Sequence, residues 1–332
     1  MNRIRTCWGG VLAAVLLLSC TAQAADLIAL GVPAGVRMTA EGVVISGMSE
    51  LDTPAGAVSP GQAAGLEIGD ILQEADGVAI DSSETLADIV RNSGGHPIQL
   101  AGLRGDTEIS AAVQPVQTTS DGAYQIGLLI RDSMAGIGTL TYVDPKNGAF
   151  GALGHPVTDV DSGARLPLET GSIIPAQVIR VEMGTAGKPG ELIGTYDFST
   201  QLGQLDDNTA CGIFGTLTNR SLYAGQPVLS TAEAEEVHTG EAEILTCVSG
   251  SQPKRYAVAI EKIAPHAADS RNLSLRVTDQ ALLEQTGGIV PGMSGSPIIQ
   301  DGKIVGAVTH VLVNHPNRGY GILIGNMLEA AG

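Results

Sequence analysis

A serine between glycines is the residue of this chain whose setting most clearly predicts chemistry. Ser294 stands in the segment GMSGSP (residues 292–297), and apolar residues follow this loop. Glycines on both sides allow a tight turn, which can aim the backbone N–H groups of Gly292 and Ser294 at one point. An oxygen at that point would carry the negative charge of a tetrahedral intermediate beside the serine hydroxyl. The loop therefore predicts a nucleophilic serine with an oxyanion hole; the alternative is a Gly/Ser turn joining two strands.

A serine nucleophile needs a general base, and histidine is the side chain that most often serves near neutral pH. The six histidines of the chain are His96, His155, His238, His266, His310 and His315. His155 is the preferred base because it lies in the glycine-flanked turn GALGHP (residues 151–156), directly after an apolar stretch. His310 ends the apolar run 303–310, which we expect to line the substrate cleft. Its ring therefore either touches the substrate or has a structural role.

The third member of such a site is an acid that orients the histidine. On sequence alone, Asp159 and Asp161 compete for this role because they follow His155 by four and six residues. Metal chemistry is not indicated, since the chain has no CxxC or HExxH segment and the spacing of Cys211 and Cys247 is not one used by metal ligands. We expect no metal and no organic cofactor.

The elements that must hold these residues are predicted to be short strands. Residues 116–332 contain many short apolar runs separated by Gly, Asp and Asn, which is typical of an all-β barrel or sandwich. The composition agrees, because 44 of the 332 residues are glycine and only 3% are aromatic. No G-x-S-x-G elbow stands between a strand and a helix, so a serine hydrolase other than a peptidase is the least favoured class.

Residues 26–115 form a separate first unit. Its run SPGQAAGLEIGDILQEADGVAI (residues 59–80) resembles a PDZ domain of the bacterial protease type, and a helical pattern follows it. PDZ domains bind an extended peptide at a sheet edge, where backbone N–H groups hold the terminal carboxylate. We predict this carboxylate loop at Ala34, Gly35 and Val36, because a glycine allows close approach. The alternative is an ordinary turn between strands.

The charge of the chain limits its partners. The formal net charge is −17, from 18 Lys+Arg and 35 Asp+Glu. Such a surface disfavours nucleic acid and anionic membranes. A length of 332 residues predicts about two domains, each with enough chain for a buried core.

The first 24 residues are typical of an export segment. Two arginines precede the apolar run 11–18, and AQA at 22–24 is a cleavage site of small residues. LLSC at 17–20 resembles a lipoprotein processing box instead, and an uncleaved membrane anchor is the third interpretation. All three place the rest of the chain outside the cytoplasm. There Cys211 and Cys247 either form a disulfide or stay as buried thiols.

As a whole, the chain resembles the SpoIVB peptidase family of sporulation signalling proteases. The matching stretches are IGLLIRDSMAGIGTLTYVDP (126–145), GALGHPVTD (151–159), TDQALLEQTGGIVPGMSGSPIIQDGKIVGAVTHVLVN (278–314) and GYGILI (319–324). The resemblance implies a mainly β chain, with an N-terminal PDZ domain followed by a chymotrypsin-like double β-barrel. It also implies His155 as catalytic base, Ser294 as nucleophile and Asp279, 15 residues before the serine, as acid. In most chymotrypsin-like enzymes the acid lies nearer the histidine in sequence, so the role of Asp279 needs testing.

The resemblance further implies an exported regulatory serine endopeptidase that cleaves one protein partner. That partner would be a membrane-bound inhibitor in the space between the two membranes of a developing spore. Its cleavage would release an intramembrane protease and activate a late sigma factor. The PDZ domain would bind peptide termini, and self-cleavage near the N-terminus is expected. The alternatives are a PDZ adaptor whose protease-like domain only binds, and a general extracytoplasmic quality-control peptidase.

Overall fold

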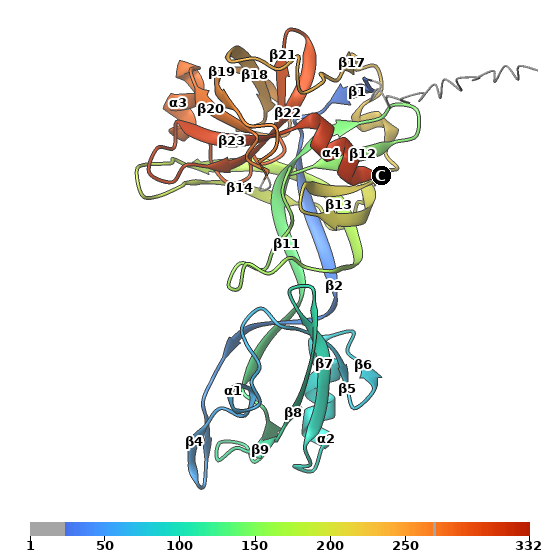
Figure 1. Ribbon diagram of the computed structural model, residues 1–332, viewed down its shortest axis with the longest axis vertical. Helices are drawn as coiled ribbons and strands as arrows, with labels where there is room; N and C mark the ends of the chain where they lie inside the picture. The colour runs from blue at the N-terminus through green and yellow to red at the C-terminus, as the bar shows by residue number, and fades with distance from the viewer. Residues whose placement is uncertain (1–23, 268–269) are drawn as a thin grey trace, which may run out of the picture.

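The computed structural model describes residues 24–267 and 270–332, and it confirms a mainly β chain. Two β-barrels lie side by side in the upper half of Figure 1, and a smaller unit lies below them. Residues 1–23 of the predicted export segment, which include the alternative processing box, lie outside the described residues. Among the helices in the two described ranges, none is long and apolar enough to cross a membrane.

The first barrel is a closed ring of six strands. Each strand pairs with the next in the order β2–β11–β12–β16–β15–β13, and β13 pairs with β2 to close the ring. The six strands are β2 (Pro33–Met48), β11 (Leu128–Val143), β12 (Ala149–Ala152), β16 (Gly212–Leu217), β15 (Gly203–Thr209) and β13 (Leu168–Glu182). Strands β1 (Asp26–Ala29), β14 (Glu191–Tyr196) and β17 (Leu229–Ser230) extend this sheet. The core of this barrel contains Leu140, Phe150 and Ile173, each at most 2% exposed.

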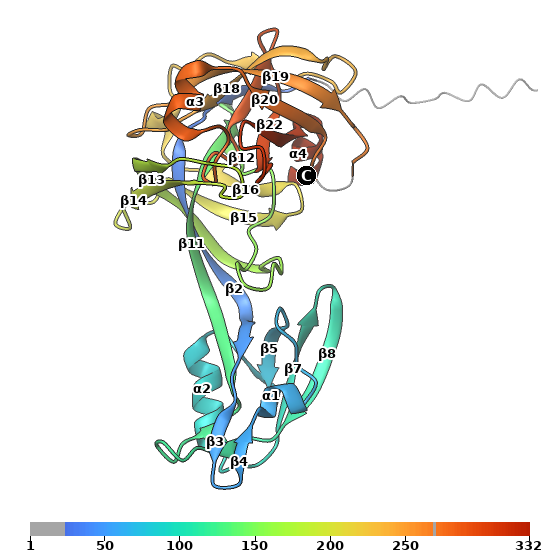
Figure 2. The same cartoon turned by 90° about the vertical axis from the view of Figure 1, so that its left-hand side faces the viewer.

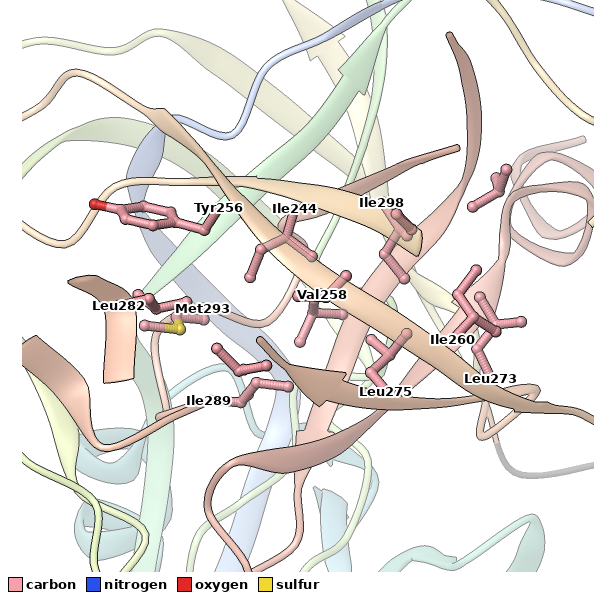
Figure 3. Packing of buried hydrophobic residues seen from close by; sticks show 14 of the residues in the cluster. Ile244, Tyr256, Val258, Ile260, Leu273, Leu275, Leu282, Ile289, Met293 and Ile298 are labelled. Atoms are coloured by element: carbon pink, nitrogen blue, oxygen red, sulfur yellow. The ribbon is translucent and has the colours of Figure 1, made fainter. Parts of the chain in front are cut away.

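The second barrel is also a closed ring of six strands. Its strands in ring order are β18 (Gly240–Thr246), β19 (Lys254–Ile263), β20 (Leu273–Val277), β23 (Arg318–Leu323), β22 (Lys303–Val311) and β21 (Pro297–Gln300). Alternate side chains point inward, as the period of a strand requires. Ile244, Val258 and Leu275 meet inside the barrel from three neighbouring strands (Figure 3). Burying each such side chain contributes roughly 1.5–3 kcal/mol, so this core holds the loops that leave the barrel.

Helices and short turns complete this half of the chain. The 3-10 helix η1 (Arg220–Leu222) follows the first barrel. Helix α3 (Gln280–Thr286) follows β20, and α4 (Ile324–Ala331) ends the chain. Ile324 and Met327 of α4 are buried, so this last helix packs against both barrels through its apolar face.

The smaller unit is a PDZ domain. Its elements are β3 (Leu51–Thr53), β4 (Gly56–Val58), α1 (Pro60–Ala63), β5 (Ile71–Ala75), β6 (Val78–Ala79), α2 (Ser83–Asn92), β7 (Ile98–Arg104), β8 (Thr107–Val113), β9 (Val116–Gln117) and β10 (Tyr124–Gln125). Ser82 caps α2 by accepting from the N–H of Thr85, and the helix buries Leu86 and Val90 in the domain core. A buried carboxylate, Asp70, is paired with Arg104 at 2.7 Å.

The strand pairings correct the predicted boundaries at 26–115 and 116–332. Strands β2 and β11 each have 16 residues and run from the PDZ domain into the first barrel (Figures 1 and 2). Residues 34–40 of β2 pair with β13 of the barrel, whereas Val43 and Val44 pair with β5 of the PDZ domain. The PDZ domain is therefore inserted between two barrel strands. A strand that runs through two cores has a continuous apolar pattern. The sequence therefore shows no break at the point where the strand leaves one core and enters the other.

The predicted carboxylate loop at Ala34, Gly35 and Val36 is wrong for the same reason. These residues lie in the barrel part of β2, where Gly35 faces Ile174 on one side and Ile137 on the other. Ala34 is 1% exposed and Val36 is 6% exposed. Because strands flank this segment on both sides, it cannot hold a peptide terminus.

Of the two alternatives for Cys211 and Cys247, the described structure has free thiols and not a disulfide. The two side chains pack in different hydrophobic clusters: Cys247 in the second barrel, and Cys211 beside α4. The Cys247 thiol donates to the backbone oxygens of Ser249 and Gly250.

Candidate active site

The loop that carries Ser294 packs tightly against the first barrel. Gly292 has φ +99° and Gly295 has φ +95°, a region that residues with a Cβ atom rarely adopt. A Cβ atom on Gly295 would lie 2.0 Å from the carbonyl oxygen of Thr139 and 2.5 Å from the backbone nitrogen of Leu153. Both features of Gly295, its backbone angle and its missing side chain, are therefore required for the loop to meet the first barrel.

Two backbone N–H groups of this loop are available to a ligand. In the hydrogen bonds of the described residues, the N–H groups of Gly292 and Ser294 donate to no protein acceptor. Leu192 on β14 donates its own N–H to the Pro291 oxygen at 2.9 Å. Because the peptide bond is planar, this contact also fixes the direction of the Gly292 N–H. These two N–H groups are the donors that the sequence predicts for an oxyanion hole.

His155 is placed by a strained turn after β12. Leu153 has φ +66° and Gly154 has φ +72°, so two consecutive residues adopt the left-handed conformation. For a leucine this conformation costs on the order of 1 kcal/mol, which the surrounding packing must offset. A Cβ atom on Gly154 would lie 2.9 Å from Thr309 Cγ2, so this turn brings the first barrel against β22.

The imidazole of His155 is oriented by a backbone oxygen. Its Nδ1 lies 2.8 Å from the carbonyl oxygen of Pro156. With the proton on Nδ1, this nitrogen donates to the carbonyl and Nε2 keeps its lone pair. Burial lowers the pKa of His155, and the Pro156 oxygen opposes that shift only in part. The ring is therefore neutral near pH 7, as a general base must be.

Ser294 and His155 line the same cleft, which lies between the barrels and has a volume of about 570 Å³. The Ser294 hydroxyl donates to the backbone oxygen of Thr309 at 2.7 Å. Among the described residues no hydrogen bond joins the side chains of Ser294 and His155. The serine is therefore held by β22 in this state, and its hydroxyl must turn to reach the imidazole.

Among the described residues, no hydrogen bond joins Asp279 to His155, so the acid implied by the resemblance stays a prediction. Its carboxylate caps α3, accepting from the N–H of Leu282 at 3.0 Å and from that of Ala257 at 3.4 Å. It is not among the residues that line the cleft. Figure 1 draws α3 at one edge of the paired barrels and β12, which precedes His155, at the other.

The two other candidate acids are also engaged elsewhere. Asp159 is 1% exposed, accepts from Ser162 and pairs with Arg131 at 3.1 Å. Asp161 pairs with the same guanidinium at 2.6 Å. The lining of the cleft includes no carboxylate among the described residues. Among the described residues, the hydrogen-bond partner of the His155 ring is the Pro156 oxygen.

Apolar side chains form most of the cleft. They come from both barrels and include Val36, Met134, Ile137, Val157, Ile289 and Val311. His310, on β22, also lines the cleft, and its ring centroid lies 5.3 Å from that of His155 with 41° between the ring planes. Such a lining favours an uncharged, apolar ligand over a charged one.

A second groove, of about 390 Å³, lies on the PDZ domain between α2 and residues 124–130. Leu86 and Val90 line it from the helix, and Gly127, which has φ +69°, lines it from the segment 124–130. In the described structure the N–H groups of Ile126 and Gly127 donate to no protein acceptor. The glycine within YQIGL (residues 124–128) is the signal that sequence reasoning missed, because this segment lies outside the predicted first unit.

The family model described as SpoIVB peptidase S55 matches residues 122–328, which is more than half of the chain. The comparison with curated proteins returned no match.

Three solved structures show partial likeness. The PDZ domain of the SdrC-like protein of Listeria monocytogenes is 24% identical, covering 28% of this chain and 92% of that one, with a TM-score of 0.23. The Rv3671c protease of M. tuberculosis, in an inactive form, is 14% identical over 59% of this chain and 84% of that one, with a TM-score of 0.33. The HtrA-type protease AlgW with a decapeptide is 13% identical, covering 74% of this chain and 66% of that one, with a TM-score of 0.34.

Proposed function

We propose that this chain, which belongs to the SpoIVB peptidase S55 family and is therefore a serine peptidase, uses Ser294 as its nucleophile and His155 as its general base. One observation carries the proposal: both side chains line the cleft that Gly292 also lines. Nucleophile, base and oxyanion donors thus lie around one cavity, which is the arrangement that acyl transfer requires.

The reaction begins when a substrate displaces the Ser294 hydroxyl from the Thr309 oxygen. Nε2 of His155 takes the hydroxyl proton as Oγ attacks the peptide carbonyl carbon. The N–H groups of Gly292 and Ser294 then hold the negative oxygen of the tetrahedral intermediate. His155 returns its proton to the leaving amine, and a water molecule hydrolyses the acyl-enzyme by the same steps.

The Pro156 carbonyl takes the orienting role that a carboxylate has in most such enzymes. It fixes the tautomer, because it accepts only from a protonated Nδ1. A neutral oxygen stabilises the imidazolium less than a carboxylate does, so we expect slow turnover. Slow turnover suits an enzyme that makes one regulatory cut rather than one that degrades proteins.

The substrate class follows from the cleft. Its apolar lining supports a protein substrate with an aliphatic residue next to the scissile bond. A charged side chain at that position would lose its hydration without gaining a partner. We expect peptides with valine or leucine there to be cut in preference to peptides with lysine or glutamate.

The biological partner is proposed on the family resemblance. We propose that the chain is exported and cleaves a membrane-associated inhibitor of an intramembrane protease in sporulation signalling, leading to late sigma-factor activation. Self-cleavage near the N-terminus is part of this proposal. The PDZ groove beside α2 would recruit the C-terminus of the target, or of the enzyme itself, through the free N–H groups of Ile126 and Gly127.

A fluorophosphonate labelling experiment tests the catalytic assignment. The full chain is treated with the reagent beside Ser294→Ala and His155→Ala, and intact-mass spectrometry locates the adduct. We expect one adduct, on Ser294, that is lost in both variants. Labelling that persists in a folded His155→Ala protein would remove that residue from the mechanism.

A binding-only function is the second candidate, because Ser294 is bonded to Thr309 and no carboxylate of the described residues is hydrogen-bonded to His155. Absence of labelling in folded wild-type protein would favour this adaptor role. A casein digestion assay distinguishes the regulatory peptidase from the third candidate, a general quality-control peptidase. We expect a regulatory peptidase to leave casein mostly intact.

A further inference from the structure

A polar hollow of about 460 Å³ lies on the first barrel, and the proposed mechanism does not use it. One guanidinium, three hydroxyls and two amides line it, from Arg37, Thr39, Thr170, Ser172, Gln201 and Gln204. Its volume falls within the range of sites that bind small molecules. No carboxylate of the described residues lines this hollow, although the chain carries 35 Asp+Glu.

The strand pairings place the central side chains of the hollow on one face of the sheet. Val36 and Met38 of β2 belong to the barrel core, so Arg37 between them points to the outer face. Arg37 stands opposite Ser172 of β13, which in turn stands opposite Gln204 of β15. These three strands are neighbours in the first barrel (Figure 2). A sheet, rather than a loop, therefore fixes the spacing of the three side chains.

Arg37 is a cation without an acidic partner. It forms no ion pair and no side-chain hydrogen bond among the described residues. Arg104 and Arg131, by contrast, are each paired with a carboxylate. A hollow on the second barrel likewise contains Arg255 together with its ion-pair partner Glu243. Because a guanidinium stays charged at every physiological pH, Arg37 gives the hollow a positive charge that no carboxylate of the described residues neutralises.

Ser172 is a buried hydroxyl without a partner in the same hollow. The residue is 5% exposed, and its Oγ has no hydrogen-bond partner among the described residues. Buried polar groups are nearly always hydrogen-bonded, to protein, to water or to a bound ion, because an unpaired one destabilises the fold. A ligand in the hollow would supply the acceptor that Ser172 lacks.

The donors of the hollow are those that bind phosphate. A guanidinium donates to phosphate oxygens through two parallel N–H groups, and hydroxyls add neutral donors. Thr39 of β2 stands opposite Thr170 of β13, as Arg37 stands opposite Ser172, so two strands each contribute two donors. The two oxygens of a carboxylate lie in one plane, whereas the four oxygens of a phosphate point in different directions and can accept from both strands. The amide of Gln204 can bind an organic group joined to the phosphate.

We propose that this hollow is a binding site for inorganic phosphate or a small phosphate monoester. A soluble ligand fits the formal net charge of −17, because an anionic membrane would repel the rest of the surface. The site is separate from the proposed peptidase chemistry. Val36 and Met38 line the catalytic cleft, whereas Arg37 between them lines the hollow on the other face of β2.

Titration calorimetry of the full chain with sodium phosphate tests the site, with sodium chloride holding the ionic strength constant. Arg37→Gln removes the cation, and Gln204→Glu places a repelling carboxylate in the hollow. Arg180→Gln and Gln177→Glu make the same exchanges at exposed positions of β13 outside the hollow. We expect one phosphate per wild-type or control chain, and affinity at least about tenfold weaker in both site variants. No binding by wild type, or equal affinity in all folded variants, would overturn the proposal.

Ser172→Ala separates a role in binding from a structural role. Removing an unpaired buried hydroxyl should leave the phosphate-free chain equally or more stable in urea unfolding. The same variant should bind phosphate about threefold more weakly, because one neutral hydrogen bond is lost. Thr141→Val removes another buried hydroxyl without a partner, outside the hollow, and should bind normally. Lower stability with unchanged affinity in Ser172→Ala would contradict the assignment of this hydroxyl to the site.

Vesicle sedimentation distinguishes the source of the phosphate. Phosphatidylcholine vesicles that contain phosphatidic acid present a phosphate monoester on a membrane surface. We expect wild type and Arg37→Gln to sediment equally with them, while free phosphate and glycerol 3-phosphate bind in calorimetry. Sedimentation that depends on Arg37, without binding of either soluble phosphate, would overturn the soluble ligand and identify a lipid headgroup instead.

Discussion

Thr139 of the first barrel holds Ser294 of the second. The Thr139 N–H donates to the Ser294 carbonyl oxygen at 3.0 Å. Its hydroxyl donates to the Gly292 oxygen at 2.9 Å, and its own carbonyl accepts from Leu153 at 3.3 Å. One buried residue of β11 thus contacts both the nucleophile loop and the turn that carries His155.

Removing the Thr139 hydroxyl should impair catalysis more than folding. Thr139→Val preserves shape but leaves the Gly292 oxygen unpaired, which costs about 1–2 kcal/mol of unfolding free energy. The loosened loop should lower kcat by about tenfold or more, with little change in KM, because oxyanion donors act in the transition state. Steady-state kinetics and urea unfolding measure the two effects.

Thr141→Val is the matched control. Thr141 lies on the same strand and is 0% exposed, and its hydroxyl has no hydrogen-bond partner in the described structure. Its replacement should leave kcat unchanged and stability equal or higher. An equal loss of kcat in both variants would show that a general disturbance of β11, rather than the Gly292 contact, matters.

Asp279 should behave as a helix cap rather than as a catalytic acid. Asp279→Ala removes the acceptor for the Leu282 N–H and should cost about 1 kcal/mol of unfolding free energy. Asp279→Ser provides another capping oxygen and should recover most of that loss. Both variants should still be labelled at Ser294 when folded. If folded Asp279→Ser protein resists labelling, the acid implied by the family resemblance regains its role.

Local motifs predicted two residues that line the same cleft, but not the hydrogen bonds of those residues. Ser294 and His155 stand out because glycines surround each of them, and such turns can be identified over a few residues. The contact of His155 with the Pro156 oxygen depends on a backbone angle that composition does not reveal. Asp279 shows what a local motif leaves open. An aspartate before QALLEQT is equally suited to cap a helix and to orient a base.

Long-range pairing explains the larger errors. The barrel-strand role of Gly35 depends on its position opposite Ile137, about a hundred residues later in the chain. The PDZ unit could be predicted from its own motif. Its insertion between β2 and β11 could not be predicted in this way. That insertion moves the end of the peptide groove to residues 124–128. A single sequence contains no signal for which distant strand a segment will join.

Acid stability should depend on Asp159. Burial alone would raise the pKa of this carboxyl, but the N–H and hydroxyl of Ser162, the N–H of Asp161 and the charge of Arg131 together lower it below 3.8. A depressed pKa in the folded state gives stability that is present above pH 3.8 and lost as the pH falls through the folded value.

Asp159→Asn should therefore be less stable than wild type at pH 7, and the difference should shrink as the pH falls below 3.8. Urea unfolding at a series of pH values measures this trend. Asp161→Asn is the control, because its half-exposed carboxylate pairs with the same Arg131 and should contribute little. A constant difference across the pH range would mean that the variant acts through packing and not through charge.

The PDZ groove should bind the free C-terminus of an apolar peptide. Leu86 and Val90 line it from the helix, and so do Ile126 and Gly127, whose N–H groups donate to no acceptor among the described residues. We expect fluorescence anisotropy to show binding of a labelled peptide that ends in valine. Amidating that peptide should weaken binding by about tenfold or more, because the carboxylate loses its charge-assisted hydrogen bonds.

Ala87→Glu places a bulky negative charge in this groove from the exposed side of α2. The variant should lose the peptide while remaining folded, since position 87 lies outside the domain core. Ala57→Glu makes the same exchange on β4, at an exposed residue that does not line the groove, and should bind normally. Equal affinity for the acid and the amide would contradict the assignment of residues 124–128. Loss of binding in Ala57→Glu alone would place the peptide on another face of the PDZ domain.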